Sequence, residues 1–212
     1  MSTATLKVRV ASKRQEAQAV CSLELVSADG GVLPPFTAGA HVDVHLPNGM
    51  VRSYSLCNAP SDAQRYQIAV LRDPASRGGS VAVHDQVSEG QTLEISPPKN
   101  HFPLAADGQR HLLLAGGIGV TPLLAMAEQL TRDGADFALH YFARSAAQAA
   151  FVSRMADSPF APRVHTHWDD TPQDPPVSLS ALIGSPQAGQ HLYVCGPKGF
   201  MDAVLDTARA QS

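Results

Sequence analysis

The sequence predicts two folded parts, an antiparallel β-barrel followed by an α/β domain built on a parallel sheet. From residue 5 to about 96, apolar and polar residues alternate in short runs separated by turn residues, which is typical of half-buried strands. After residues 103–109 the pattern changes to continuous apolar runs that alternate with helical stretches, as in a sheet covered on both faces. We therefore expect a barrel domain over residues 1–104 and an α/β domain over residues 108–212.

The first part contains six predicted antiparallel strands and one short helix. Asn48 and Gly49 supply the left-handed residues of a tight turn between the third and fourth strands. The stretch after Arg77 predicts one or two helical turns that Ser80 caps. The predicted strands are TLKVRV, CSLELVS, HVDVH, VRSYSLCN, RYQIAVLRD and QTLEISPP.

The second part alternates apolar strands with helices. Its first strand ends in a glycine-rich turn, after which Thr121 and Pro122 suit the N-cap and first position of a helix. The predicted strands are RHLLLAGG, DFALHYFA, RVHTHW and QHLYVCG, and the predicted helices are TPLLAMAEQLTRDG, SAAQAAFVSRMA and PKGFMDAVLDTARAQ.

Composition excludes several classes of protein. The chain has 212 residues and a formal net charge of −3, so no basic field attracts nucleic acid or an anionic membrane. Its three cysteines stand far apart, which argues against a disulfide framework. Neither a signal peptide nor an apolar run of about 20 residues is present, so we expect a soluble, cytoplasmic protein without membrane contact.

The stretch RSYS at residues 52–55 brings a cation, an aromatic plane and hydroxyls together on one strand. This combination fits a bound flavin: Tyr54 would stack on the ring, Ser55 would contact the ring near N5, and Arg52 would clamp the phosphate. The glycines of RGGS at residues 77–80 would let backbone N–H groups approach the same phosphate at a helix start. The alternative is an ordinary cation–aromatic pair on a barrel surface. The other residues expected at this site are Ser53, Ala69, Val70, Arg72, Gly78, Gly79 and Ser80.

A second glycine-rich turn, GGIGVT at residues 116–121, joins an apolar strand to a helix. Such a turn allows a pyrophosphate to approach the backbone at the helix N-terminus. It is not a complete G-x-G-x-x-G, and the alternative is a tight turn without a ligand. Cys195 follows another apolar strand, where its thiol would lie against the reacting carbon of a nicotinamide or, alternatively, be a buried structural side chain.

In this order, the motifs RSYSLCN, RGGSVAVHDQVSEG, PPKNHFPL, LLLAGGIGVTPLLAM and YVCGP resemble the ferredoxin–NADP reductase superfamily. The similarity spans about residues 5–205 and is greatest with the phthalate dioxygenase reductase and vanillate O-demethylase reductase branch. The resemblance implies a flavin barrel and a pyridine-nucleotide domain whose rings stack at the interface, with FMN favoured over FAD and NADH over NADPH. It places the nucleotide against Gly116, Gly117, Ile118, Thr121, Cys195, Gly196 and Pro197, with Arg144 and Ser145 at the adenosine end.

The expected activity is hydride transfer from NADH to FMN, followed by electron transfer to a ferredoxin-type [2Fe–2S] domain or protein and a terminal oxygenase. Ser55, Thr121 and Cys195 are the predicted catalytic residues. The superfamily branch usually continues into a [2Fe–2S] domain, but three scattered cysteines cannot supply its four ligands. The cluster would therefore belong to a separate protein or to a longer form of this chain.

Three other interpretations remain open from the sequence. The chain could be a free-standing flavin reductase, or a flavin-binding sensor without turnover. Its nine histidines also suggest a metal site as a third interpretation. His41, Asp43 and His45 alternate onto one strand face, as do His165 and His167. We expect no metal, because the alternation with Val42, Val44 and Leu46 already explains that first group as a solvated face.

Overall fold

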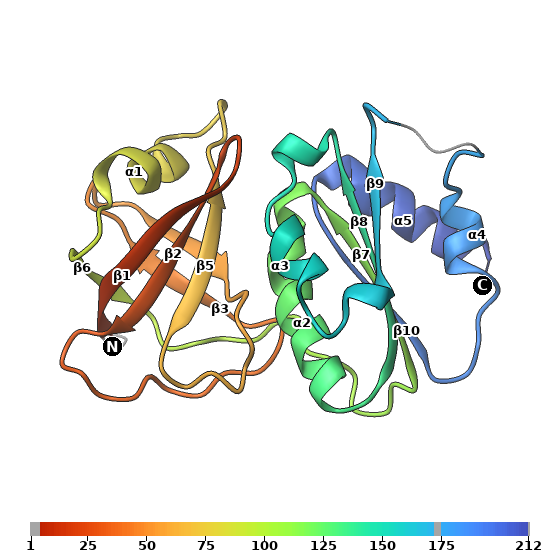
Figure 1. Cartoon of the computed structure of the whole chain (residues 1–212), viewed down its shortest axis with the longest axis horizontal. Coiled ribbons are helices and arrows are strands. Elements are labelled where there is room, and N and C mark those ends of the chain that lie inside the picture. The colour runs from red at the N-terminus through yellow and green to blue at the C-terminus, as the bar shows by residue number, and fades with distance from the viewer. Residues whose placement is uncertain (1–4, 172–174, 212) are drawn as a thin grey trace.

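The computed structural model describes residues 5–171 and 175–211. Two sheets lie side by side (Figure 1), a six-stranded antiparallel sheet in the order β4-β3-β6-β1-β2-β5 and a four-stranded parallel sheet in the order β10-β7-β8-β9. The fold class predicted from the sequence, a six-stranded antiparallel barrel followed by a parallel α/β sheet, is confirmed.

Alternating side chains build the core of the antiparallel sheet. Val8 and Val10 of β1, Leu23 of β2 and Val42 of β3 are fully buried, whereas Lys7 and Arg9 of β1 are exposed. The strand β1 is longer than predicted because two irregularities in its pairing with β2 let it bend around the core. The strands are β1 (Leu6–Ala17), β2 (Val20–Ser27), β3 (His41–His45), β4 (Val51–Ser55), β5 (Tyr66–Leu71) and β6 (Thr92–Ile95), with α1 (Gly79–Gln86) before β6.

The turn predicted at Asn48-Gly49 joins β3 to β4. Gly49 has a φ of 79°, in the left-handed region where glycine carries no Cβ penalty. The Leu46 N–H donates to the Met50 carbonyl at 2.8 Å and closes the hairpin. The hairpin therefore presents β4, with its RSYS stretch, beside β3.

The barrel closes just beyond the end of β4. The Cys57 N–H donates to the Gln67 carbonyl at 2.8 Å, and the Gln67 N–H donates to Asn58 Oδ1 at 2.9 Å. The Gln67 side chain reaches the other sheet's helices, because its Oε1 accepts from Arg154 Nη1 at 3.0 Å. Arg154 also bonds Glu128 at 3.1 Å, so one buried glutamine is shared by both parts of the chain.

Helices cover the parallel sheet on both faces, α2 and α3 toward the barrel and α4 and α5 on the far side (Figure 1). Leu113 and Leu139 pack under α2, whereas Leu112 and Leu114 pack under α5 with Val204. No helix among the described residues has the length and apolar character to cross a membrane. The elements are β7 (Arg110–Gly116), η1 (Gly117–Gly119), α2 (Val120–Arg132), β8 (Asp136–Ala143), η2 (Ala146–Gln148), α3 (Val152–Ala156), η3 (Ala161–Arg163), β9 (Val164–Trp168), α4 (Leu179–Ile183), β10 (Gln190–Cys195) and α5 (Lys198–Ala210).

The two predicted helix caps are wrong. The N-cap of α1 is Gly78, with φ 104°, and the Ser80 hydroxyl instead accepts from the Asp73 N–H at 3.2 Å. The N-cap of α2 is Gly119, and the Thr121 hydroxyl donates to the Ile118 carbonyl at 3.0 Å. In both places a glycine caps the helix two residues earlier, so the hydroxyl lies inside the first turn and bonds the preceding segment.

Candidate functional site

Arg52 of β4 lies directly against the start of α1. A Cβ at Gly79 would lie 2.8 Å from Arg52 Nε and 3.0 Å from its Cγ, so only glycine admits this packing. The guanidinium donates to the Val51 carbonyl at 2.8 Å and to Met50 Sδ at 3.4 Å. Among the described residues no carboxylate pairs with it, so its charge remains available for an anion.

The N-terminus of α1 adds backbone donors to the same place. The first turn of α1 carries no acidic residue, and no side chain caps it. Its free N–H groups and the positive end of the helix dipole therefore face the region beside Arg52. Asn48 Nδ2 donates to the Gly78 carbonyl at 3.1 Å and ties the hairpin tip to this loop. The residues present fit a phosphate group.

Tyr54 shares the Arg52 face of β4, opposite Val42 of β3. The Tyr54 ring packs against the barrel core, and burial raises its pKa to about 12, so the phenol is neutral at physiological pH. Ser53 lies on the other face of the strand, and its hydroxyl donates to Asp43 Oδ1 at 2.5 Å. The two faces of the RSYS stretch thus have different surroundings, as predicted from strand alternation.

A cavity of about 350 Å³ brings predicted residues of both parts together. Ser53 and Ser55 line it from the barrel, and Cys195 lines it from the end of β10. Burial raises the pKa of the Cys195 thiol, so it is a neutral side chain and not a thiolate. His41 and His101, whose ring centroids are 5.5 Å apart, also line this cavity. Neither histidine was predicted at the flavin or nucleotide site, because the alternation around His41 indicated only a solvated face.

A larger cavity, of about 860 Å³, opens at the carboxyl ends of β7, β8 and β10. The turn between β1 and β2 and the end of β5 form its opposite wall. Strand carboxyl ends are where a parallel sheet receives its ligand. The predicted residues gathered here are Arg72, Gly116, Gly117, Ile118, Arg144, Gly196 and Pro197.

The three glycines of the GGIGVT turn have different roles. Gly117 has a φ of 53°, which favours glycine, and open space where a Cβ would stand. A Cβ at Gly119 would lie 2.2 Å from the Cys195 carbonyl oxygen, so this residue serves the contact between two loops. A Cβ at Gly116 would lie 2.8 Å from Phe200 Cδ1. Phe200 was not predicted at the site; its place one turn after Gly196 on a helix start is the signal that could have found it.

Several predicted residues lie outside both cavities. Ala69 and Val70 are buried in the antiparallel sheet, and Thr121 is buried in the first turn of α2. Ser145 is the N-cap of η2, where its carbonyl accepts from Gln148. The side chains of Ala69 and Val70 fill the protein core, and the expectation that these strand residues line a flavin ring stays a prediction.

Arg72 lies in the larger cavity but has a partner of its own. Its Nη1 and Nη2 both donate to the carboxylate of Asp85 of α1, the second at 3.0 Å. This pairing lowers the pKa of the Asp85 carboxyl. The ion pair is exposed and links the end of β5 to α1. The Asp85 carboxylate therefore compensates the charge of Arg72 in the absence of a ligand.

The histidine groups are explained by other contacts. Asp43 accepts from Lys99 Nζ at 2.6 Å, and within residues 5–171 and 175–211 no group of three metal-ligating side chains could hold an ion. On the far face of the parallel sheet, His140 Nδ1 and His167 Nε2 are 3.0 Å apart in nearly parallel rings. Burial lowers the pKa of His140 to about 4, so its ring is neutral at pH 7.

Comparison with known proteins gives one family and many close relatives. The chain is 54% identical to the vanillate O-demethylase oxidoreductase of Pseudomonas putida over 95% of its length, and 40% identical to the phthalate dioxygenase reductase of Burkholderia cepacia. It covers 63% of the length of each of these two relatives.

Among solved structures, phthalate dioxygenase reductase matches with a TM-score of 0.92 and 39% identity over 98% of this chain and 65% of the other. The resemblance predicted from the motifs is confirmed. The family described as "Dimethylamine monooxygenase subunit DmmA-like, N-terminal domain" matches residues 92–212, more than half of the sequence, and the chain belongs to this family.

Proposed function

We propose that the chain is the flavin- and nucleotide-binding part of a reductase that passes electrons from NADH through FMN to an iron–sulfur partner of an oxygenase. The observation that carries this proposal is the presence of two places suited to bind an anion, one in each part of the chain. Arg52, which pairs with no carboxylate of the described residues, lies beside the N-terminus of α1, and the Gly117 turn lies in the large cavity at the ends of the parallel strands.

When bound, the flavin would supply hydride acceptance from the reduced nicotinamide and release of electrons one at a time. The residues of this chain have to bind and orient the two rings and exclude water. Reaction requires the donor and acceptor atoms to be held about 3–3.5 Å apart. Ser55 and Cys195 line one cavity from opposite sides, which supports their role beside that contact. Thr121 acts through the backbone, because its hydroxyl fixes the Ile118 carbonyl in the glycine-rich turn.

The closed end of the phosphate site supports FMN over FAD. The hairpin tip covers this end, since Asn48 bonds the Gly78 carbonyl and Met50 contacts Arg52. A Cβ at Gly78 would meet Asn48 Nδ2 and Met50 Cε at 3.6 Å each. FMN ends at its phosphate, whereas FAD continues into an adenosine, which the hairpin would obstruct.

The charge balance of the nucleotide cavity supports NADH over NADPH. Arg144 lines this cavity together with the carboxylate of Asp169, and Arg72 is paired with Asp85. The described lining therefore has no excess positive charge to compensate the additional phosphate of NADPH.

The names of the relatives support an oxygenase system as the destination of the electrons. The relatives include a tert-butanol monooxygenase reductase subunit and the phthalate 4,5-dioxygenase oxygenase reductase subunit. Phthalate dioxygenase reductase is described as a modular structure for electron transfer from pyridine nucleotides to [2Fe–2S]. We therefore propose a ferredoxin-type domain or protein as the direct partner and a terminal oxygenase beyond it.

The test is an absorbance spectrum of the purified chain, followed by flavin extraction, mass determination and anaerobic addition of NADH. We expect a yellow protein that releases FMN and whose flavin absorption bleaches with NADH. A bound flavin that NADH does not bleach would indicate a sensor. Rapid loss of reduced flavin into solution would indicate a free-standing flavin reductase. A colourless chain that also rejects added FMN and FAD would contradict the proposal.

A further inference from the structure

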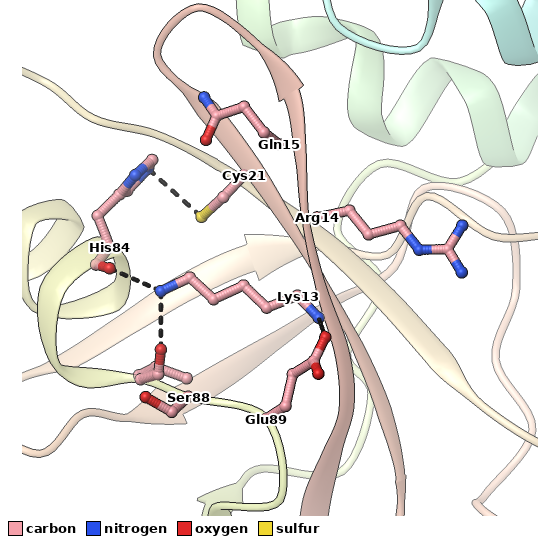
Figure 2. A pocket seen from close by; sticks show the side chains of 8 residues that line it. Lys13, Arg14, Gln15, Cys21, His84, Ser88 and Glu89 are labelled. Carbon is pink, nitrogen blue, oxygen red and sulfur yellow. Dashed lines mark hydrogen bonds between the residues drawn. The ribbon is translucent and has the colours of Figure 1, made fainter.

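A cavity of about 670 Å³ on the barrel is bounded by β1 and by the end of α1 (Figure 2). Lys13 of β1 extends its side chain across this space to α1. Its ammonium donates to the carbonyls of Val83 at 3.0 Å, His84 at 2.6 Å and Val87 at 2.7 Å. A lysine has three donors, so all of them are used on the last turn of this one helix.

The position of the Lys13 backbone is fixed as well. Its N–H donates to Glu89 Oε1 at 2.8 Å, from the segment that follows α1. The ammonium satisfies carbonyls that a helix end leaves without partners, and its charge complements the negative end of the helix dipole. Because α1 has only 8 residues, it depends on such tertiary contacts for its position.

A second contact holds the same turn of α1. His84 Nε2 lies 2.9 Å from the Val70 carbonyl, which can only accept, so the ring donates this hydrogen bond. Cys21 Sγ lies 3.4 Å from the same nitrogen (Figure 2). Since Nε2 carries its hydrogen toward Val70, the His84 ring does not withdraw a proton from Cys21 there. The side chains around this cavity therefore support α1 and do not form a second reactive site.

The two ends of α1 contact different side chains. Its C-terminal turn is held by Lys13, and its first residue, Gly79, lies against Arg52. The helix is about 12 Å long, so a small tilt at the supported end displaces the N–H groups at the other end. We expect the direction of these N–H groups relative to the Arg52 guanidinium to depend on the Lys13 contact.

We infer that Lys13 is a positioning residue, which holds α1 so that its N-terminal N–H groups and Arg52 converge on the phosphate of the bound flavin. The inference rests on the proposed function, because it needs a flavin phosphate at that place. It goes further than the proposed function in one respect. Lys13 would increase the preference of the site for a phosphorylated flavin over an unphosphorylated one, although its side chain does not contact the flavin. Lys13 acts on the phosphate end of the flavin, and the ring contacts are independent of it.

The test compares FMN with riboflavin, which has the same ring and no phosphate. Flavin-free full-length chains carrying Lys13→Met, Lys13→Arg or the control Arg14→Met are titrated with each flavin by fluorescence quenching. Arg14 lines the same cavity, is exposed, and points away from α1 (Figure 2). We expect Lys13→Met to weaken FMN binding about tenfold and to leave riboflavin binding within about twofold. Arg14→Met should change neither affinity.

A general loss of structure would weaken both flavins equally, and that result would overturn the inference, as would an unchanged FMN affinity. Should Lys13→Met fail to fold, the Lys13→Arg variant tests the positioning role instead, because its planar guanidinium cannot bond the three carbonyls as an ammonium does. We expect it to lower the ratio of FMN to riboflavin affinity by about threefold, and an unchanged ratio contradicts the role. A parent chain that binds neither flavin contradicts the proposed function instead, so the two failures are distinguishable.

Discussion

The guanidinium of Arg52 occupies the space that a side chain at position 79 would fill, with Nε 2.8 Å from where a Cβ of residue 79 would stand. The two residues come from different elements, β4 and the first turn of α1, and 27 positions separate them in the chain. Their contact brings the charge of Arg52 to the backbone donors of α1. We expect anion binding at this place to depend on position 79 remaining a glycine.

Replacing Gly79 with alanine should weaken FMN binding without unfolding the chain. The added methyl group forces the flexible Arg52 side chain to move, while alanine is a better helix residue than glycine. We expect an FMN dissociation constant about tenfold higher, measured by fluorescence titration, and a thermal midpoint at or slightly above that of the parent. Equal FMN affinity in the variant and the parent would contradict a role for this contact.

Arg52→Ala should weaken flavin binding and leave NADH binding nearly unchanged. Arg52 lies on the barrel and does not line the large cavity at the parallel strands. We expect the purified variant to retain much less flavin than the parent, with NADH affinity changed by less than about threefold. Flavin content is measured by extraction and nucleotide affinity by calorimetry, and equal flavin content would refute the clamp.

Cys195→Ala should slow flavin reduction but leave flavin retention unchanged. The thiol is neutral and lines the small cavity together with Ser55, so the role we propose for it is contact with the rings and not proton transfer. We expect the anaerobic bleaching rate with NADH to fall about tenfold or more, measured by stopped flow. An unchanged rate would show that Cys195 is only a structural side chain.

Gly117 and Gly119 offer a matched pair for the glycine-rich turn. Gly117→Ala places a methyl group in open space at a φ of 53°, which costs about 1–2 kcal/mol. Gly119→Ala would place its methyl group 2.2 Å from the Cys195 carbonyl oxygen, a backbone atom that cannot turn away. We expect Gly119→Ala to lose more than about 4 kcal/mol or to fail to fold. Urea denaturation of both variants checks this order, and similar stabilities would contradict it.

The buried His140 should make the fold sensitive to acid. Because burial lowers its pKa from 6.5 to about 4, the unfolded chain binds this proton more readily than the folded chain. Stability is therefore retained above about pH 6.5 and lost as the pH falls toward 4, by up to about 3 kcal/mol. Denaturation curves at pH 7.5 and 4.5 should show a smaller difference for His140→Asn than for the parent. His45→Asn, an exposed position, should leave the difference unchanged.

The periodicity of the sequence predicted the strands well because burial imposes it directly. The strand at Asp136–Ala143 begins and ends where the apolar run does, and the helix at Lys198–Ala210 differs from its prediction by one residue at each end. The hairpin at Gly49 was predictable because its turn needs a left-handed residue. These features depend on neighbouring residues alone.

The failures have a common physical origin in contacts between distant residues. The predicted helix over SAAQAAFVSRMA is interrupted because Phe151 adopts a φ of 63° and its ring packs into the core. The Tyr141 hydroxyl accepts from the Ala150 N–H at 3.0 Å and stabilises that bend. The roles of Gly116 and Gly119 could not be assigned either, because the atoms that approach them come from residues about 80 positions later.

Gln67 supplies a backbone bond that closes the barrel and a side-chain bond to a helix of the other part. When either half melts, the other loses a partner for a buried polar group, which is energetically costly. The two halves should consequently unfold in a single cooperative transition, seen in a calorimeter as one endotherm for the whole chain. The helices around the parallel sheet and the strands of the antiparallel sheet should unfold at the same temperature.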